Sequence, residues 1–245
     1  QVAKAVKEIR SEFRLALTGT PVENRLSELW SIFDFLMPGF LYSYEKFRKE
    51  IELPAVQYSN SDAMERLQKM IRPFVLRRLK RDVLKDLPDK LEKDMFSPLE
   101  SEQKELYEAH TERLRLMLGM QSDAEFRTSK LQILAEITRL RQICCYPGLV
   151  YEGYEGNSSK LEMCMELVRN AVNGGHKILL FSQFTSMLEL IGQRLKKEGI
   201  AFHLLTGATP KEERIRMAGA FQTDDTPVFL ISLKAGGTGL NLTAA

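Results

Sequence analysis

The residues best suited to chemistry in this chain follow three apolar runs. They form the short stretches Ser182-Gln-Phe-Thr185, Thr206-Gly-Ala-Thr209 and Ser232 to Thr238, which offer hydroxyls, an amide and glycine backbone but no carboxylate. Backbone N–H groups at the start of a helix, beside such hydroxyls, favour phosphate oxygens, and Lys234 adds a positive charge. These stretches indicate a surface for a chain of phosphates.

The same stretches do not make a hydrolytic site. Gly236-Gly-Thr-Gly239 lacks the Gly-Lys-Ser/Thr ending that grips phosphates and magnesium, and no such ending occurs in the 245 residues. No cluster of paired acidic residues follows a predicted strand. The three histidines and three cysteines lack metal-ligand spacing, and the cysteines fall on apolar helical patterns. We therefore expect no catalytic residue and no metal site in this chain.

Strand and helix patterns alternate from residue 156 onward. Ser159 and Glu162 fit a capping box at the start of the first helix. Strands that are apolar on both faces belong in a parallel sheet covered by helices, so the three polar stretches should meet at its carboxyl edge. The predicted strands are 177–182, 200–205 and 227–232.

The first 150 residues are predicted to be mainly helical. A short strand over Phe13–Leu17 leads to the turn Thr18-Gly-Thr-Pro21 and then to an amphipathic helix that ends at Pro38-Gly39. Mixed-charge helical patterns fill residues 40 to 150.

A basic segment stands apart in a chain whose net charge is only +2. Arg72 to Arg81 contains five basic residues around an apolar centre. It is either a solvated helix face anchored by Phe74 and Leu76, or a segment that faces phosphates or braces neighbouring lobes. No apolar run is long enough to predict a membrane span.

An ordered set of stretches runs along the chain. It comprises Leu17-Thr-Gly-Thr-Pro21, Leu29-Trp30 with Phe33-Asp-Phe-Leu36 and Pro38-Gly-Phe40, Pro73-Phe74 with Leu76-Arg-Arg78 and Lys80 through Val83, Phe181-Ser-Gln-Phe-Thr185, and Ser232 through Ala245. This set resembles the Swi/Snf-type remodelling ATPases of helicase superfamily two. It spans nearly the whole chain in the family's order, which makes it far more specific than any one motif.

The resemblance implies an α/β fold of partial RecA-like lobes, each a parallel sheet with helices on both faces, and a large, mainly α-helical insertion between them. It divides the chain into the end of lobe 1 at 1–39, helical protrusion 1 at 40–72, a linker and basic brace at 73–95, helical protrusion 2 at 96–150, and lobe 2 at 156–245, truncated before its last motif.

The resemblance also implies roles for individual residues. Thr18, Gly19 and Thr20 would couple the nucleotide site to lobe movement, and Arg77, Arg78 and Lys80 would form the brace. Gly239 and Asn241 would approach the ATP ribose. The residues expected to face DNA are Ser182, Gln183, Thr206, Gly207, Ser232, Lys234, Gly237 and Thr238.

The family's activity is ATP hydrolysis with Mg²⁺, coupled to movement along double-stranded DNA. DNA-bound proteins are further expected partners, in the bacterial cytoplasm at the nucleoid or in a eukaryotic nucleus. The family's phosphate-binding loop and acidic box would lie upstream of Thr18, and its arginine motif downstream of the glycine loop. We therefore expect a fragment that neither binds ATP tightly nor hydrolyses it.

Two other hypotheses for the function stay open. The chain is alternatively a non-catalytic DNA-binding or protein-interaction module, with the helical middle as its docking surface. A free-standing α/β enzyme acting on a phosphorylated small molecule is the third reading, but it lacks a plausible base or nucleophile near the polar stretches.

Overall fold

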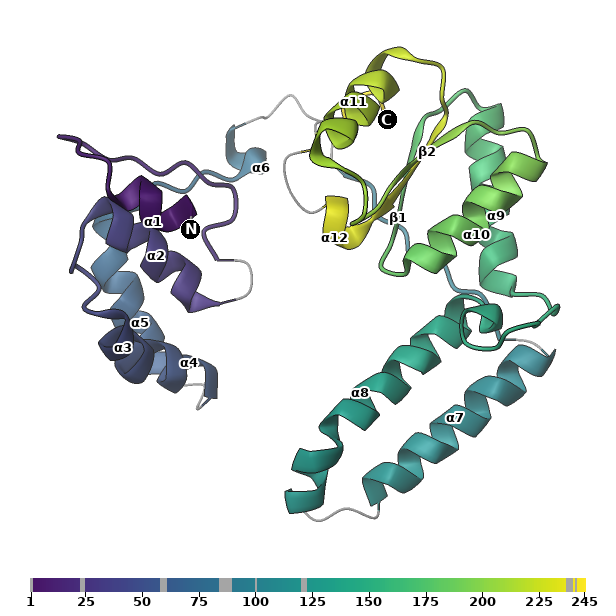
Figure 1. Ribbon diagram of the computed structural model, residues 1–245, viewed down its shortest axis with the longest axis horizontal. Helices are drawn as coiled ribbons and strands as arrows, with labels where there is room; N and C mark the ends of the chain where they lie inside the picture. Colours follow the sequence, from purple (N-terminus) through teal and green to yellow (C-terminus); the bar gives the residue numbers. More distant parts are fainter. Residues whose placement is uncertain are drawn as a thin grey trace. The chain divides into compact units, whose positions relative to one another are not determined.

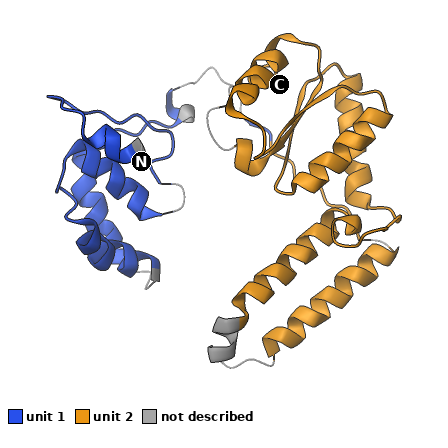
Figure 2. Ribbon diagram, in the orientation of Figure 1, with its two compact units in different colours: residues 1–91 blue, residues 92–245 orange. Residues whose placement is uncertain are grey.

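The chain forms two compact units, residues 1–91 and residues 92–245 (Figure 2). Each unit has its own hydrophobic core. In the described part of the chain, no helix is both long and apolar enough to cross a membrane. The computed structural model describes residues 2–22, 25–57, 61–83, 90–99, 101–119, 123–236, 240 and 242–245.

The first unit is helical in its described residues. Its principal helices are α2 (Leu26–Leu36) and α5 (Ser61–Ile71). Its shorter segments are α1 (Val2–Lys7), α3 (Tyr44–Phe47), the π-helical turn η1 (Arg48–Glu52), α4 (Leu53–Gln57), the 3₁₀ turn η2 (Arg72–Phe74) and α6 (Lys80–Val83).

The core of the first unit forms around α2. Leu29 and Phe33 lie one helical turn apart on the buried face of α2, as the apolar spacing predicts. Phe33 stacks on Phe40 with ring centroids 5.8 Å apart, and Phe40 meets Phe74 edge-on at 5.1 Å. The other buried members of this core are Leu41, Phe47, Ile51 and Leu67.

The strand predicted over Phe13–Leu17 is wrong for this structure. The segment has no strand partner among the described residues, and the side chains of Phe13 and Leu17 are 88% and 99% exposed. A strand is stable only when neighbouring strands satisfy its backbone hydrogen bonds. The segment is held instead by Arg14, whose guanidinium donates to the carbonyl of Phe35 at 2.7 Å and to that of Ile9 at 3.0 Å.

The second unit joins a helical hairpin to an α/β sheet (Figure 1). The hairpin consists of α7 (Ser101–Gly119) and α8 (Asp123–Cys145), and the 3₁₀ turn η3 (Pro147–Leu149) follows it. The α/β part consists of α9 (Ser159–Asn173), β1 (Ile178–Ser182), α10 (Thr185–Lys197), β2 (Phe202–Leu205), α11 (Lys211–Thr223), β3 (Val228–Ser232) and α12 (Leu233–Gly236).

All three strands are parallel, in the order β1-β3-β2. The central strand β3 is fully buried, and its side chains alternate between the faces of the sheet. Val228 and Leu230 pack with α9 and α10, whereas Phe229 and Ile231 pack with α11 and α12. The predicted parallel sheet with helices on both faces is therefore confirmed.

A buried polar network lies between the two helices of the hairpin. His110 of α7 is hydrogen-bonded through Nδ1 to Glu136 of α8 and through Nε2 to the Tyr151 hydroxyl at 2.6 Å. Arg139 donates to the second carboxylate oxygen of Glu136 at 3.1 Å. Burial raises the pKa of Glu136, but hydrogen bonds from His110 and Arg139 outweigh it, so the pKa lies below its ordinary value. The network ties α7, α8 and the chain after η3 together.

Candidate functional site

The strand register brings the three predicted polar stretches to one edge of the sheet. Ser182 at the end of β1 pairs with Ser232 at the end of β3, and Leu205 at the end of β2 pairs with Ile231. Thr206 therefore begins its loop beside the end of β3. The described DNA-facing candidates at this carboxyl edge are Ser182, Gln183, Thr206, Gly207, Ser232 and Lys234.

The loop after β1 is a tight turn into α10. The Ser182 hydroxyl accepts a hydrogen bond from the backbone N–H of Phe184 at 3.1 Å. Gln183 is exposed, and its side-chain oxygen accepts a hydrogen bond from the Arg141 guanidinium of α8 at 2.5 Å. Arg141 was absent from the sequence candidates because only the fold brings it to this edge.

The loop after β2 is held by an arginine. The Thr206 hydroxyl accepts from the N–H of Ala208 at 3.3 Å, and the Thr206 N–H donates to the Thr209 hydroxyl at 3.0 Å. Arg214, one turn into α11, donates to the carbonyls of Thr209, Thr206 and Gly207 at 2.9, 3.3 and 3.2 Å. The sequence did not predict this role for Arg214, because every residue has a backbone carbonyl and such contacts therefore require no particular residue types.

The loop after β3 leads directly into the short helix α12. Ser232 is 3% exposed, and its hydroxyl accepts from the N–H of Ala235 at 3.3 Å, so it caps this helix. Lys234 is exposed and supplies the positive charge of this loop. The candidates Gly237, Thr238, Gly239 and Asn241 lie outside the described residues.

The first unit carries the coupling and brace candidates. Thr18, Gly19 and Thr20 are exposed, and the Thr18 hydroxyl accepts from the N–H of Thr20 at 3.1 Å. Thr20 lines a hollow of about 510 Å³ with residues of α1 and α2.

The basic segment is not the helix that one reading of its pattern predicts. Arg77 and Arg78 are exposed in an irregular stretch between η2 and α6, and Lys80 begins α6. Leu76 is 80% exposed, so it does not anchor the segment to a core of the described residues. The side chain of Phe74 is half exposed and contacts Phe40.

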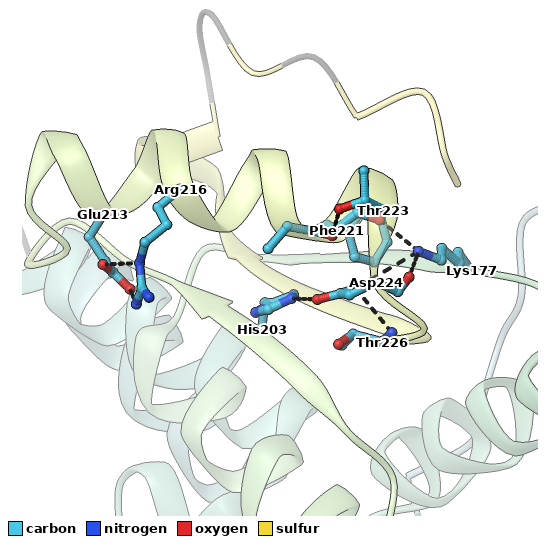
Figure 3. Close-up of polar contacts among 9 residues, drawn as sticks. Lys177, His203, Glu213, Arg216, Phe221, Thr223, Asp224 and Thr226 are labelled. Atoms are coloured by element: carbon cyan, nitrogen blue, oxygen red, sulfur yellow. Dashed lines mark hydrogen bonds and ion pairs between the residues drawn. The ribbon is translucent and has the colours of Figure 1, made fainter.

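A second polar cluster lies at the opposite, amino edge of the sheet (Figure 3). Lys177 donates to the carbonyls of Phe221 and Asp224 at 2.6 and 2.5 Å at the end of α11. His203 Nε2 lies 2.9 Å from the Asp224 carboxylate, which also accepts from the Thr226 N–H at 3.1 Å. Partial burial raises the pKa of Asp224, but these hydrogen bonds lower it overall. The contacts join β1, β2 and α11 and are structural.

Comparisons with known proteins identify the family of the chain. Residues 1–149 match the model of the SNF2-related domain, and residues 159–245 match that of the helicase conserved C-terminal domain. The chain belongs to the SNF2-related family. The expected family and the expected RecA-like fold class are thus confirmed.

Bacterial relatives resemble this chain over nearly its whole length. YwqA of Bacillus subtilis is 39% identical over 99% of this chain and 27% of its own length. An uncharacterized ATP-dependent helicase of Mycoplasma pneumoniae is 37% identical over 100% of this chain and 23% of its own length. This SNF2-family chain thus spans about a quarter of the length of these relatives.

A solved structure matches the SNF2-family chain from end to end. The SWI2/SNF2 ATPase core of Sulfolobus solfataricus, in complex with double-stranded DNA, is 35% identical with a TM-score of 0.57. The match covers 100% of this chain and 52% of the archaeal chain.

The described loops of this SNF2-family chain do not fit ATP bound with magnesium. Magnesium prefers carboxylates together with phosphate oxygens, and the described residues of 182–185, 206–209 and 232–236 include no carboxylate. Their hydroxyls, amide and ammonium group suit a sugar–phosphate backbone better than a metal-bound nucleotide.

Proposed function

We propose that this chain supplies the coupling motif and part of the DNA-tracking surface of an ATPase that moves along double-stranded DNA. The observation that carries the proposal is the strand register, which gathers Ser182, Thr206 and Lys234 at the carboxyl edge of the sheet. Phosphate groups dominate the affinity of proteins for DNA, and neutral donors beside an exposed cation are the groups that bind them. The archaeal neighbour, whose structure contains double-stranded DNA, supports this partner.

The proposed division of labour follows the family resemblance. Residues 1–39 end the first lobe and carry Thr18 to Thr20, and residues 40–72 form the first helical protrusion. Residues 73–95 are the linker and brace, and the boundary between the compact units at Leu91 lies within them. Residues 96–150 contain the hairpin and 156–245 the second lobe. DNA lies along the edge loops, and Gly239 and Asn241 approach ATP in the complete protein.

The chain alone does not hydrolyse ATP under this proposal. Its 245 residues contain no Gly-Lys-Ser/Thr phosphate-binding sequence. The complete protein supplies ATP and Mg²⁺ binding from other segments, whereas a non-catalytic module would bind DNA without hydrolysing ATP in any form. DNA-stimulated phosphate release by the complete protein separates the two.

A salt titration tests the DNA surface. Binding of a short fluorescein-labelled duplex is followed by anisotropy between about 50 and 200 mM salt, a range over which phosphate contacts weaken steeply. Lys234→Ala should weaken binding and lower the slope of log K against log salt by about one. Lys197→Ala is the matched control, because this exposed lysine ends α10 at the opposite edge of the sheet. Equal affinities and slopes for both variants would contradict the assignment.

A further inference from the structure

A cavity opens where the hairpin meets the carboxyl end of β1. Its volume is about 580 Å³, and α7, α8, α9 and β1 all contribute to its lining. The polar groups of the lining include the Tyr107 and Ser182 hydroxyls and the Gln183 amide. Its charged lining residues are Arg141 and Lys160, and no carboxylate lines it. The cavity therefore has a positive rim over an apolar floor.

The Arg141 guanidinium can donate hydrogen bonds to a further ligand. It is exposed and uses one N–H to hold Gln183 at 2.5 Å, whereas a guanidinium has five N–H donors. The ion pairs of the described residues include none with Arg141 or Lys160.

Two other arginines of the same unit, in contrast, form ion pairs with glutamates. Arg139, two residues before Arg141, pairs with Glu136 at 3.1 Å. Arg169 pairs with Glu198 at 3.0 Å. Arg141 and Lys160 thus contribute a local positive potential beside the Ser182–Gln183 turn, and such a potential attracts an anionic backbone.

We propose that Arg141 and Lys160 bind a backbone phosphate of duplex DNA at the end of β1. Gln183 holds the guanidinium at this position, so the DNA surface continues from the sheet loops onto the root of the helical hairpin. The Arg141 guanidinium has N–H donors beyond the one that holds Gln183, and together with the Lys160 ammonium these donors match a phosphate group. This inference rests on the proposed DNA-tracking function and adds to it Lys160 at the start of α9 and, from outside the lobe, Arg141 of the hairpin.

The same anisotropy titration tests the two cations. Arg141→Gln should weaken duplex binding about tenfold at low salt and lower the salt slope by about one, and Arg141→Gln with Lys160→Gln should lower it by about two. Arg141→Lys keeps the charge and should retain most of the slope. The matched control is Arg115→Gln, which removes the same charge from an exposed position on α7.

Cysteine alkylation gives a second, independent readout of the same cavity. All three cysteines of the chain, Cys144, Cys145 and Cys164, line this cavity. Burial raises the pKa of each thiol, so alkylation by iodoacetamide is slow and easily timed. A bound duplex should slow it several-fold further, and should do so less in Arg141→Gln. Pyrophosphate at the same phosphate concentration should not, because one small anion does not cover the cavity.

Three results would overturn the inference. If Lys234→Ala weakens binding while Arg141→Gln and Lys160→Gln match Arg115→Gln, the cavity does not bind DNA, although the proposed function stands. If pyrophosphate protects the thiols as well as DNA does, the site belongs to a small anion. If the unaltered chain binds no duplex at any salt concentration, the inference and the proposed function fail together. Far-UV circular dichroism of each variant shows that it is folded.

Discussion

Among single residues, two long cationic side chains stabilise the segments that border the sheet. They do so by donating hydrogen bonds to backbone carbonyls. Arg214 fixes the loop after β2 through three carbonyls. Lys177 does the same at the end of α11 through the carbonyls of Phe221 and Asp224. A cation at a helix C-terminus satisfies carbonyls that lack a partner in the helix and interacts favourably with its dipole.

Replacing Lys177 should destabilise the second unit. Lys177→Met keeps most of the aliphatic stem but removes the ammonium group, both of its hydrogen bonds and its contact with the Phe221 ring. We expect a loss of about 2 kcal/mol, typical of a hydrogen bond to a charged group. Urea unfolding followed by circular dichroism measures it. Lys197→Met, at an exposed position, should change the free energy of unfolding little, and an equal loss in both variants would contradict the assigned role.

Glu136 should make stability depend on acid pH. Its pKa is below the ordinary value in the folded state and returns to that value on unfolding. The unfolded chain therefore binds more protons, so the contribution of Glu136 is full at neutral pH and is lost as pH falls below about 5. Urea unfolding across this range should give a flatter profile for Glu136→Gln than for the unaltered chain. Glu112→Gln, on the exposed face of α7, should keep the profile of the unaltered chain. The acid loss due to Asp224, whose pKa is also lowered, should be the same in all three proteins.

At the scale of elements, the sequence predicted the α/β part well because its signals are local. The three strands lie within the predicted ranges, and the predicted amphipathic helix before Pro38 is α2, with Leu29 and Phe33 on its buried face. The cap of α9 was wrong by one residue, since the Ser158 hydroxyl, and not that of Ser159, accepts from the Leu161 N–H. Adjacent serines offer the same local signal.

The failures at this scale come from long-range partners. Phe13–Leu17 has a strand pattern, but a strand needs neighbours that the described residues do not provide. Arg141 reaches Gln183 across 42 positions of the sequence, so no window of residues contains the pair. The loops at the carboxyl edge of the sheet were therefore predictable from the sequence. The contribution of the hairpin to the same site, through Arg141, was not.

Close packing of α10 on the sheet leads to an element-scale prediction. A Cβ at Gly192 would meet the Phe202 ring at 2.9 Å, whereas a Cβ at Gly219 of α11 would meet nothing within 4 Å. Gly192→Leu should therefore destabilise the unit by about 1–3 kcal/mol through overpacking. Gly219→Leu should instead stabilise it by up to about 1 kcal/mol, because leucine favours helix. Thermal unfolding of both variants checks the opposite signs, and a shared sign would contradict the packing argument.

At the scale of the whole molecule, the two compact units carry different natural probes. The only tryptophan, Trp30, lies in the first unit, and all three cysteines lie in the second. Since each unit has its own core, we expect tryptophan fluorescence and thiol alkylation to report unfolding transitions at different urea concentrations. Residues 92–245 expressed alone should keep the alkylation midpoint. Coincident midpoints in the whole chain would argue for a single cooperative unit.

The chain should also lack ATP turnover. Under the proposed function we expect no DNA-stimulated phosphate release from the 245 residues, which contain no Gly-Lys-Ser/Thr phosphate-binding sequence. Measurable turnover by the purified chain, absent after Lys234→Ala, would contradict the proposed division of labour.

The hairpin converts small tilts into large displacements. With 23 residues, α8 extends about 34 Å from its root at the sheet edge, where Arg141 holds Gln183. A tilt of one degree at that root would displace the far end by about 0.6 Å. A spectroscopic probe near the tip would thus amplify rearrangements around β1 that are too small to detect at the sheet itself.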